Sequence, residues 1–303
     1  MTPLLDVRNL ELGLRHGAQA HRILKGVSFQ IMPGETYGLV GESGSGKSVT
    51  SLAIIGLLKK PLQILGGEIF FEGRNLLALP RRKMRSLRGS RIAMVFQEPM
   101  SALNPLQTVG RQIAEMYVQH QGKSWAQAQK MAVEALASVR VPTPERRVHD
   151  YPHQMSGGLR QRVMIAMALA CDPALLIADE PTTALDVTVQ AEVLKLIREL
   201  CAARGTAVLF ISHDLGVIAT MCQRVGVMYA GCLVEENATR ELFVDPRHEY
   251  TRGLLGALPK LGSRGLHGRQ RLVDIDSFIA DRSRLTDTRF IAPRTPVSGE
   301  AGS

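Results

Sequence analysis

The residues best suited to chemistry lie in a glycine-rich loop at positions 41–48, which reads GESGSGKS. The loop matches the pattern G-x-x-x-x-G-K-[ST], in which glycines let backbone N–H groups close around phosphate oxygens. The lysine of the pattern reaches the terminal phosphates and its serine hydroxyl binds Mg²⁺. We therefore expect nucleotide binding by this loop and by the first residue after it: Gly41, Glu42, Ser43, Gly44, Ser45, Gly46, Lys47, Ser48 and Val49.

The segments on either side of the loop fit the arrangement that this chemistry needs. Residues 37–40 form a short apolar run that is typical of a buried strand, and residues 49–58 are apolar and compatible with a helix. In the order strand, loop, helix, the N-terminus of the helix faces the phosphates. A glycine and serine turn that happens to contain a lysine would not explain this order.

A second candidate group of residues follows the apolar run at 174–178, which ends in Asp179 and Glu180. A phosphate loop requires an aliphatic strand that ends in an acid, because the acid holds Mg²⁺ directly or through water. Glu180 can orient and deprotonate an attacking water, for which its pKa need be raised only modestly. An acid pair that merely caps a helix is the alternative, and the loop upstream makes it less favoured.

Two further polar residues follow candidate strands. Gln97 comes after residues 92–96, and His213 comes after residues 208–212. Ligands of open α/β sheets bind at the carboxyl ends of the strands, where both residues are expected to lie. Taken alone, each is more readily explained as an ordinary polar residue of a turn.

The alternation of apolar runs and amphipathic stretches predicts an α/β fold. We expect a mostly parallel sheet with antiparallel strands near the N-terminus and an inserted helical subdomain. Together with the phosphate loop, this arrangement resembles a RecA-like phosphate-loop ATPase core. Helices are predicted at residues 109–120, 125–139 and 158–170 of that insertion. The expected boundaries are an ATPase domain at 1–255, built from a core at 1–88 and 168–255 and an insertion at about 89–167, followed by a C-terminal extension at 256–303.

The composition excludes several classes of protein. The chain has 303 residues, of which 45% are hydrophobic and 21% charged, as in a globular protein. It contains no uninterrupted apolar stretch of about 18 residues that would span a membrane, and its first residues do not resemble a secretion signal. The cysteines are scattered, without a C-x-x-C pair, and are expected to be reduced thiols: Cys171, Cys201, Cys222 and Cys232.

The net charge of +9 comes largely from the basic run at residues 81–91. Aromatic residues do not interleave with these charges, so base stacking is not indicated and no nucleic-acid partner is expected. A solvated basic face is the favoured interpretation, and contact with an anionic membrane surface or with a partner protein is the alternative.

A segment downstream identifies the family that the chain resembles. Residues 156–162, SGGLRQR, resemble the signature sequence of ATP-binding-cassette (ABC) ATPases, which separates this family from other phosphate-loop proteins. Residues 178–182 resemble the acidic strand end of the family, and residues 183–186 resemble its D-loop. Gln97 resembles its Q-loop glutamine and His213 its switch histidine. All these segments occur in the family's order, and the resemblance covers about residues 4–255.

The resemblance implies roles for these residues. Glu180, His213 and Gln97 would be catalytic, with His213 at the γ-phosphate, and Mg²⁺ would be held at Ser48, Gln97 and Asp179. The signature would complete the ATP site of a partner cassette through the N-terminus of its helix. Its residues are Ser156, Gly157, Gly158 and Gln161, with Asp186 in the D-loop. ATP would thus join two cassettes, and hydrolysis would release them.

Finer matches point to one group within the family. FQEPMSALNP at 96–105, YPHQMSGG at 151–158 and PRHEYTRGLL at 246–255 resemble the ATPase subunits of dipeptide, oligopeptide and nickel importers. The partners implied are a second ATPase subunit (more often different than identical), two membrane-spanning permease subunits and a substrate-binding protein. The location implied is peripheral, on the cytoplasmic face of the bacterial inner membrane. The transported solute cannot be read from this chain, because other subunits contact it.

Two departures from the family pattern affect the expectations. The stretch at residues 14–22 has no Tyr, Phe or Trp where the family usually stacks an aromatic ring on adenine, so His16 or His21 would take that role. Many relatives carry a cysteine-bearing tail that resembles an iron–sulfur site, whereas residues 259–303 contain no cysteine. We therefore expect ATP and Mg²⁺ but no iron–sulfur cluster, and a partly disordered tail.

A second class of function is a non-transport ABC ATPase that acts on DNA or on ribosomes. Such proteins usually carry two cassettes in one chain, or long coiled-coil or zinc-binding insertions. This chain has one phosphate loop, one signature and no cysteine pair. The sequence therefore favours the importer.

Overall fold

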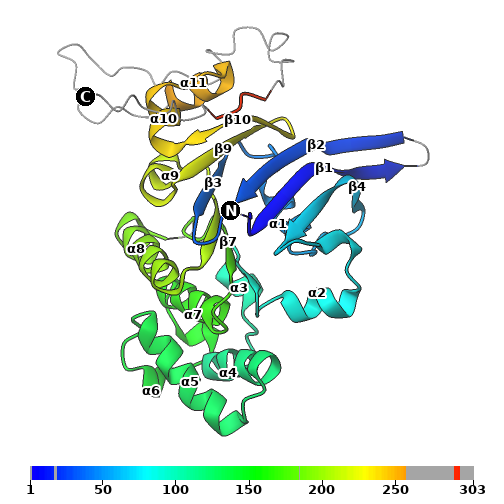
Figure 1. Cartoon of the computed structure of the whole chain (residues 1–303). Helices are drawn as coiled ribbons and strands as arrows, with labels where there is room; N and C mark the ends of the chain where they lie inside the picture. Colours follow the sequence, from blue (N-terminus) through cyan, green and yellow to red (C-terminus); the bar gives the residue numbers. More distant parts are fainter. Residues whose placement is uncertain (1, 17–18, 184, 257–289, 294–303) are drawn as a thin grey trace, which may run out of the picture.

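The computed structural model describes residues 2–16, 19–183, 185–256 and 290–293. The chain builds two sheets and a group of helices (Figure 1). The first sheet is antiparallel, with strand order β2-β1-β4-β5. Its strands are β1 (Leu5–His16), β2 (Gln19–Ile31), β4 (Leu62–Phe71) and β5 (Arg74–Asn75). These are the antiparallel strands that the sequence predicts near the N-terminus.

The second sheet has the order β10-β9-β3-β8-β7-β6 and carries the chemistry. All its pairs are parallel except β9 with β10. Every residue of β6, β7 and β8 is buried, as expected for apolar parallel strands that are covered on both faces. The strands are β3 (Thr36–Val40), β6 (Ile92–Val95), β7 (Leu175–Asp179), β8 (Ala207–Ile211), β9 (Arg224–Tyr229) and β10 (Cys232–Ala238).

The position of β6 changes one predicted boundary. We expected the helical insertion to begin at about residue 89, but Ile92–Val95 pair with β7 and belong to the core sheet. The insertion therefore starts after this strand. The reason is visible in the burial pattern, since all residues of β6 are buried.

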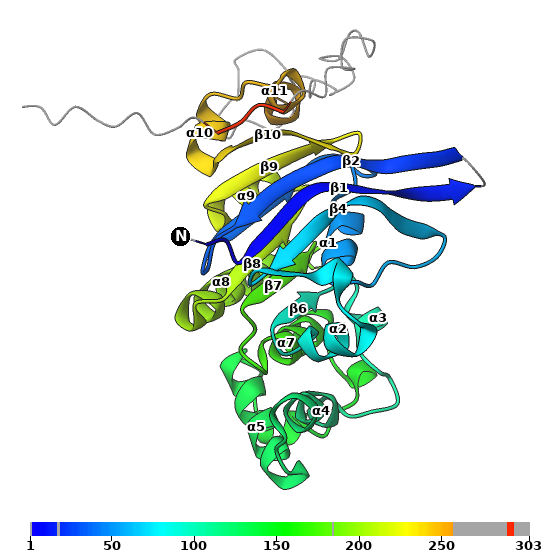
Figure 2. The ribbon, with the colours of Figure 1, turned by 45° about the vertical axis from the view of Figure 1, so that its right-hand side comes forward.

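The helical insertion lies at the end of the molecule opposite β10 (Figures 1 and 2). The helices are α3 (Pro99–Ala102), α4 (Val109–Gln121), α5 (Trp125–Ser138), α6 (Pro144–Arg147) and α7 (Gly157–Leu169). Capping residues begin two of its helices: Thr108 caps α4, and Ser124 forms a capping box with Gln127 at the start of α5. Gly122, with φ of 64°, ends the first of these helices in a left-handed turn.

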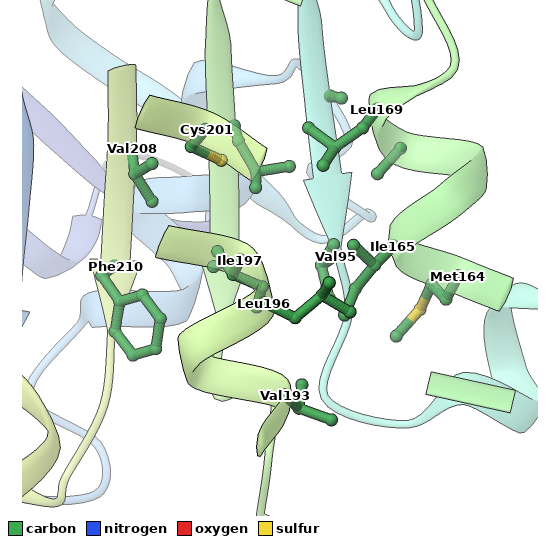
Figure 3. Packing of buried hydrophobic residues seen from close by; sticks show 14 of the residues in the cluster. Val95, Met164, Ile165, Leu169, Val193, Leu196, Ile197, Cys201, Val208 and Phe210 are labelled. Carbon is green, nitrogen blue, oxygen red and sulfur yellow. The ribbon is translucent and has the colours of Figure 1, made fainter. Parts of the chain in front are cut away.

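Apolar packing on the two faces of the core sheet holds the elements together. Alternate residues of β8 point to opposite faces, with Phe210 on one and Leu209 on the other. On the first face, Phe210 lies near Ile197 of α8 (Val187–Arg204), and Ile165 of α7 lies beside Val95 of β6 (Figure 3). The other face packs against α1 (Lys47–Ile54) and the antiparallel sheet. The strand ends are thereby fixed relative to the helices.

The C-terminal part of the domain closes the sheet beside β10. It contains α9 (Leu215–Met221), α10 (Thr239–Val244) and α11 (Glu249–Gly256). Elsewhere in the chain, the basic run at residues 81–91 forms the helix α2 (Arg81–Leu87). Residues 290–293 return to β10, where Ile291 exchanges backbone hydrogen bonds with Val234 and Glu236 (Figure 1). The rest of the extension, on which the prediction of disorder falls, lies outside the described residues.

An ion-pair cluster ties β9 to its neighbours. Arg224 contacts the carboxylates of Glu35 and Glu236 and lies over the ring of Tyr37. Both carboxylates are buried, and burial raises the pKa of Glu236 against the opposing effect of Arg224. Without the guanidinium, two buried carboxylates would face each other.

Replacing Arg224 with methionine should therefore destabilise the protein, by about 2 kcal/mol after allowance for the partial exposure of the arginine. A raised pKa of Glu236 in the folded state means that the folded protein binds its proton more readily than the unfolded chain. The contribution of Glu236 to the free energy of unfolding is therefore largest at low pH, and it is lost as the pH rises through the raised pKa. We expect Arg224→Met to lower the melting temperature more at pH 8 than at pH 5.5. Equal shifts at both values would contradict this account.

Candidate functional site

The phosphate loop joins β3 to α1, as the sequence predicts. Gly46, in a left-handed conformation with φ of 107°, precedes the first residue of the helix. The Lys47 ammonium lies folded into the loop and donates to the carbonyl oxygens of Gly41 (2.7 Å) and Glu42 (2.8 Å). A side chain at Gly41 would meet the carbonyl oxygen of Met228 at 2.1 Å, so the close approach of the strand requires glycine there.

Lys47 is a buried charge, with an exposed fraction of 5%. Desolvation lowers its pKa, and the nearby carboxylates of Glu180, Asp179 and Glu42 act in the opposite direction. An ammonium in this position gains strongly from an added anion, because both partners lie in a poorly solvated place. The loop is thus suited to a polyphosphate.

The Asp179 carboxylate lies beside the start of α1. Its Oδ1 accepts a hydrogen bond from Ser48 Oγ at 3.1 Å, and its Oδ2 accepts one from Ser51 Oγ at 3.3 Å. Burial is the largest influence on Asp179 and raises its pKa. A desolvated carboxylate next to a hydroxyl oxygen offers the hard oxygen ligands that Mg²⁺ prefers. The residues present therefore fit a bound Mg²⁺.

Glu180 is the centre of a second cluster, built from the ends of three adjacent strands. Its carboxylate accepts from Gln97 Nε2 at 3.0 Å, lies 3.0 Å from His213 Nδ1, and accepts from Thr183 Oγ1 at 3.1 Å. Glu180 itself has φ of 47°, a strained conformation for a non-glycine residue. Its backbone N–H is held by the carbonyl of Ile211 in β8. The structure thus brings together the residues that the sequence predicts as catalytic.

The signature segment opens α7. The Ser156 hydroxyl accepts from the backbone N–H of Leu159 and caps the helix, and the side chain of Gln161 is buried with its amide nitrogen unpaired among the described residues. A Cβ at Gly158 would meet Val189 at 2.9 Å, whereas one at Gly157 would come no closer than 3.9 Å to Leu185. The start of the signature helix therefore lies against the first turn of α8 and next to the D-loop of its own chain.

Asp186 of the D-loop caps the next helix, α8. Its Oδ1 accepts from the backbone N–H of Val189 at 3.0 Å, and the residue is exposed. This position follows from the sequence, since an aspartate before an apolar periodic run is a common helix start.

The predicted adenine contacts lie on the β1–β2 hairpin. His16 ends β1 opposite Gln19, and His21 is an exposed residue of β2 opposite Leu14. The hairpin projects from the side of the molecule (Figures 1 and 2). Stacking of either imidazole on adenine stays a prediction.

Several residues around the site were not foreseen. Ser51 and Thr183 contact the two acids, and the Tyr250 hydroxyl accepts a hydrogen bond from Glu42 N–H at 3.0 Å. The first two could have been suspected from their closeness in sequence to the loop and to Glu180. The third joins positions 208 residues apart, for which the sequence holds no local signal.

The cysteines within the described residues are unpaired. Cys201, Cys222 and Cys232 are buried and Cys171 is partly buried, all with free thiols. The described part holds no cluster of three or more metal-binding side chains. Among the same residues, no helix combines the length and the apolar character needed to cross a bilayer.

Known proteins resemble this chain over most of its length. Residues 24–183 match the ABC transporter family. A probable peptide ABC transporter ATP-binding protein, y4tR, of Sinorhizobium fredii (strain NBRC 101917 / NGR234) is 57% identical over 84% of this chain and 77% of its own. The oligopeptide transport ATP-binding protein OppD of Bacillus subtilis (strain 168) is 50% identical over 88% of this chain and 74% of its own.

A solved structure agrees with the fold. The ATP-binding cassette MJ0796, in a dimeric post-hydrolysis state bound to ADP and Pi, superimposes with a TM-score of 0.69 at 29% identity, covering 78% of this chain and 99% of that one. The RecA-like core with a helical insertion is thus confirmed as a cassette fold. The loop, the two acids, the signature and these likenesses together place the chain in the ABC transporter family, as one of its ATP-binding proteins.

Proposed function

We propose that this protein is the ATP-hydrolysing subunit of a bacterial importer that takes up dipeptides or oligopeptides, with nickel or a related solute as the alternative cargo. The observation that carries the proposal is the Glu180 cluster next to the phosphate loop, because it unites a base, a water-orienting amide and an imidazole beside a phosphate-binding lysine. The peptide cargo is supported by the names of relatives at 57% and 50% identity. None of the relatives described above favours an action on DNA or ribosomes.

The proposed hydrolysis uses the chain's own residues in separate roles. Lys47 binds the terminal phosphates and stabilises the charge that develops on the transferred group. Glu180 accepts the proton of the attacking water, Gln97 orients that water, and His213 contacts the γ-phosphate. Ser48, Asp179 and Gln97 would hold Mg²⁺, which would supply further positive charge to the phosphate oxygens when bound.

The proposed site is completed by a second cassette. The N-terminus of α7 carries free N–H groups and a partial positive charge, which suit the γ-phosphate of a partner's ATP. Ser156 and Gly157 at that terminus are exposed, and MJ0796 was solved as a dimer with ADP and Pi. We infer that ATP joins this chain to a second ATPase subunit, either a different one or a copy, and that hydrolysis separates them.

The helical insertion offers a docking place for the membrane subunits. A groove of about 840 Å³ lies between the start of α4 and the helices α5 and α6. Leu106, Trp125 and Tyr151 line it and are exposed to 85%, 46% and 39%. Such exposed apolar side chains are typical of a protein interface. We propose that a helix of a permease subunit fills this groove, which would place the protein on the cytoplasmic face of the membrane, with a substrate-binding protein as the further partner.

Replacing Lys47 with alanine should weaken ATP binding by at least about tenfold and abolish turnover, because a charge-assisted contact to the phosphates is lost. The measurement is equilibrium binding of ATP to the full chain, together with phosphate release by the assembled transporter. Lys59→Ala, at an exposed lysine beyond α1, is the matched control and should bind normally. Full turnover by the Lys47→Ala transporter would contradict the assignment.

Replacing Glu180 with glutamine should preserve ATP binding and slow hydrolysis by at least about a hundredfold, since the amide keeps the shape and loses the base. Single-turnover phosphate release reads this out. Glu98→Gln changes a neighbouring exposed acid and serves as the control. Turnover by Glu180→Gln within a few-fold of the wild type would assign the base to another residue.

A bulky side chain in the signature should block ATP-driven dimerisation and leave ATP binding by the isolated subunit intact. Gly157 is the cleaner position, because a Cβ added there lies 3.9 Å from Leu185, its nearest neighbour among the described residues, whereas a Cβ at Gly158 would lie 2.9 Å from Val189. We expect Gly157→Leu to bind ATP normally as an isolated subunit and to fail in ATP-driven association within the complex, with Gly157→Ala as the small control. Loss of binding by the isolated variant would show that the signature serves its own chain's site.

A further inference from the structure

The phosphate loop is touched from the C-terminal side of the domain by one tyrosine. Tyr250 of α11 is fully buried, and its hydroxyl accepts a hydrogen bond from the backbone N–H of Glu42 at 3.0 Å. Its ring packs on Tyr229 of β9, with 4.4 Å between the ring centroids. Phenylalanine would fill the same space, so the hydroxyl is the part of this side chain that reaches the loop.

The tyrosine is itself fixed by contacts to β10. The Glu235 carboxylate is fully buried and accepts from the backbone N–H groups of Arg247 and His248, both at 2.9 Å, directly before α11 begins. Arg247 also donates to the carbonyl oxygen of Ala292, in the segment that pairs with β10. The position of the Tyr250 hydroxyl is therefore set by the core sheet.

The loop residue that Tyr250 contacts is held from two sides. Tyr250 binds the N–H of Glu42, while the Lys47 ammonium binds its carbonyl oxygen at 2.8 Å. The Ser45 carbonyl further along the loop accepts from Gly231 N–H at 3.2 Å, in the turn between β9 and β10. Glu42 is otherwise exposed, so the loop has few other contacts at this point.

We propose that Tyr250 is a positioning residue for nucleotide binding, whose hydroxyl holds Glu42 N–H and keeps the phosphate loop in its receiving shape. A loop that is already ordered loses less conformational entropy when a polyphosphate binds, so its affinity is higher. The affinity of the loop then depends on α11 and, through Glu235, on β10. This inference rests on the proposed binding of ATP at the loop.

The test compares Tyr250→Phe with the wild-type full chain in equilibrium binding of ADP and of ATP, at a temperature well below melting. Loss of one net hydrogen bond predicts about three- to tenfold weaker binding. The factor should be the same for ADP and ATP, because the loop grips phosphates that both share. Hydrogen exchange at the Glu42 amide should speed up in the nucleotide-free variant, while the melting temperature stays within a few degrees of the wild type.

The matched control is Tyr229→Phe, which removes the hydroxyl of the neighbouring ring. Tyr229 makes no hydrogen bond through its hydroxyl within the described residues, so its variant should bind both nucleotides as the wild type does. Unchanged affinity of Tyr250→Phe, or an equal loss in both variants, would overturn the proposal. Failure of the wild-type chain to bind either nucleotide would count against the proposed function instead.

Discussion

A buried lysine ammonium is the constraint on which the rest of the site depends. Lys47 must stay charged to bind phosphate, yet it is almost fully buried and its pKa is lowered by desolvation. Two carbonyl oxygens of its own loop and the nearby acids offset this cost. Asp179 ends β7 and Glu180 follows it directly, and only β8 lies between β7 and β3. The parallel order of the sheet therefore brings the compensating charges to the lysine.

Packing on both faces of the core sheet holds Lys47 and the acids in fixed positions. α7 and α8 cover one face, while α1 and the antiparallel sheet cover the other. The strand ends that carry Gln97, Glu180 and His213 are thus held within hydrogen-bond distance of one another. The strained backbone of Glu180 is consistent with this, since a conformation of this kind persists only where the surroundings over-determine it.

The sequence predicts those parts of the site that rest on local patterns. The phosphate loop, the acids after β7 and the helix caps at Ser156 and Asp186 all depend on neighbouring residues, and the structure has them at the expected positions. β10 was not foreseen, because its Glu235 and Glu236 suggest an exposed segment. They are buried only because backbone N–H groups near α11 and the guanidinium of Arg224 satisfy them. The contact of Tyr250 is likewise a product of tertiary packing.

The most direct test of the account is the linkage between Mg²⁺ and nucleotide at the loop. The affinity of the full chain for ATP is measured with and without Mg²⁺, for the wild type and for Ser48→Ala. We expect one saturable site whose affinity for ATP rises with Mg²⁺ in the wild type. Most of that gain should be lost in Ser48→Ala, with little change in metal-free binding. Binding that ignores Mg²⁺ in both proteins, or no binding by the wild type, would contradict it.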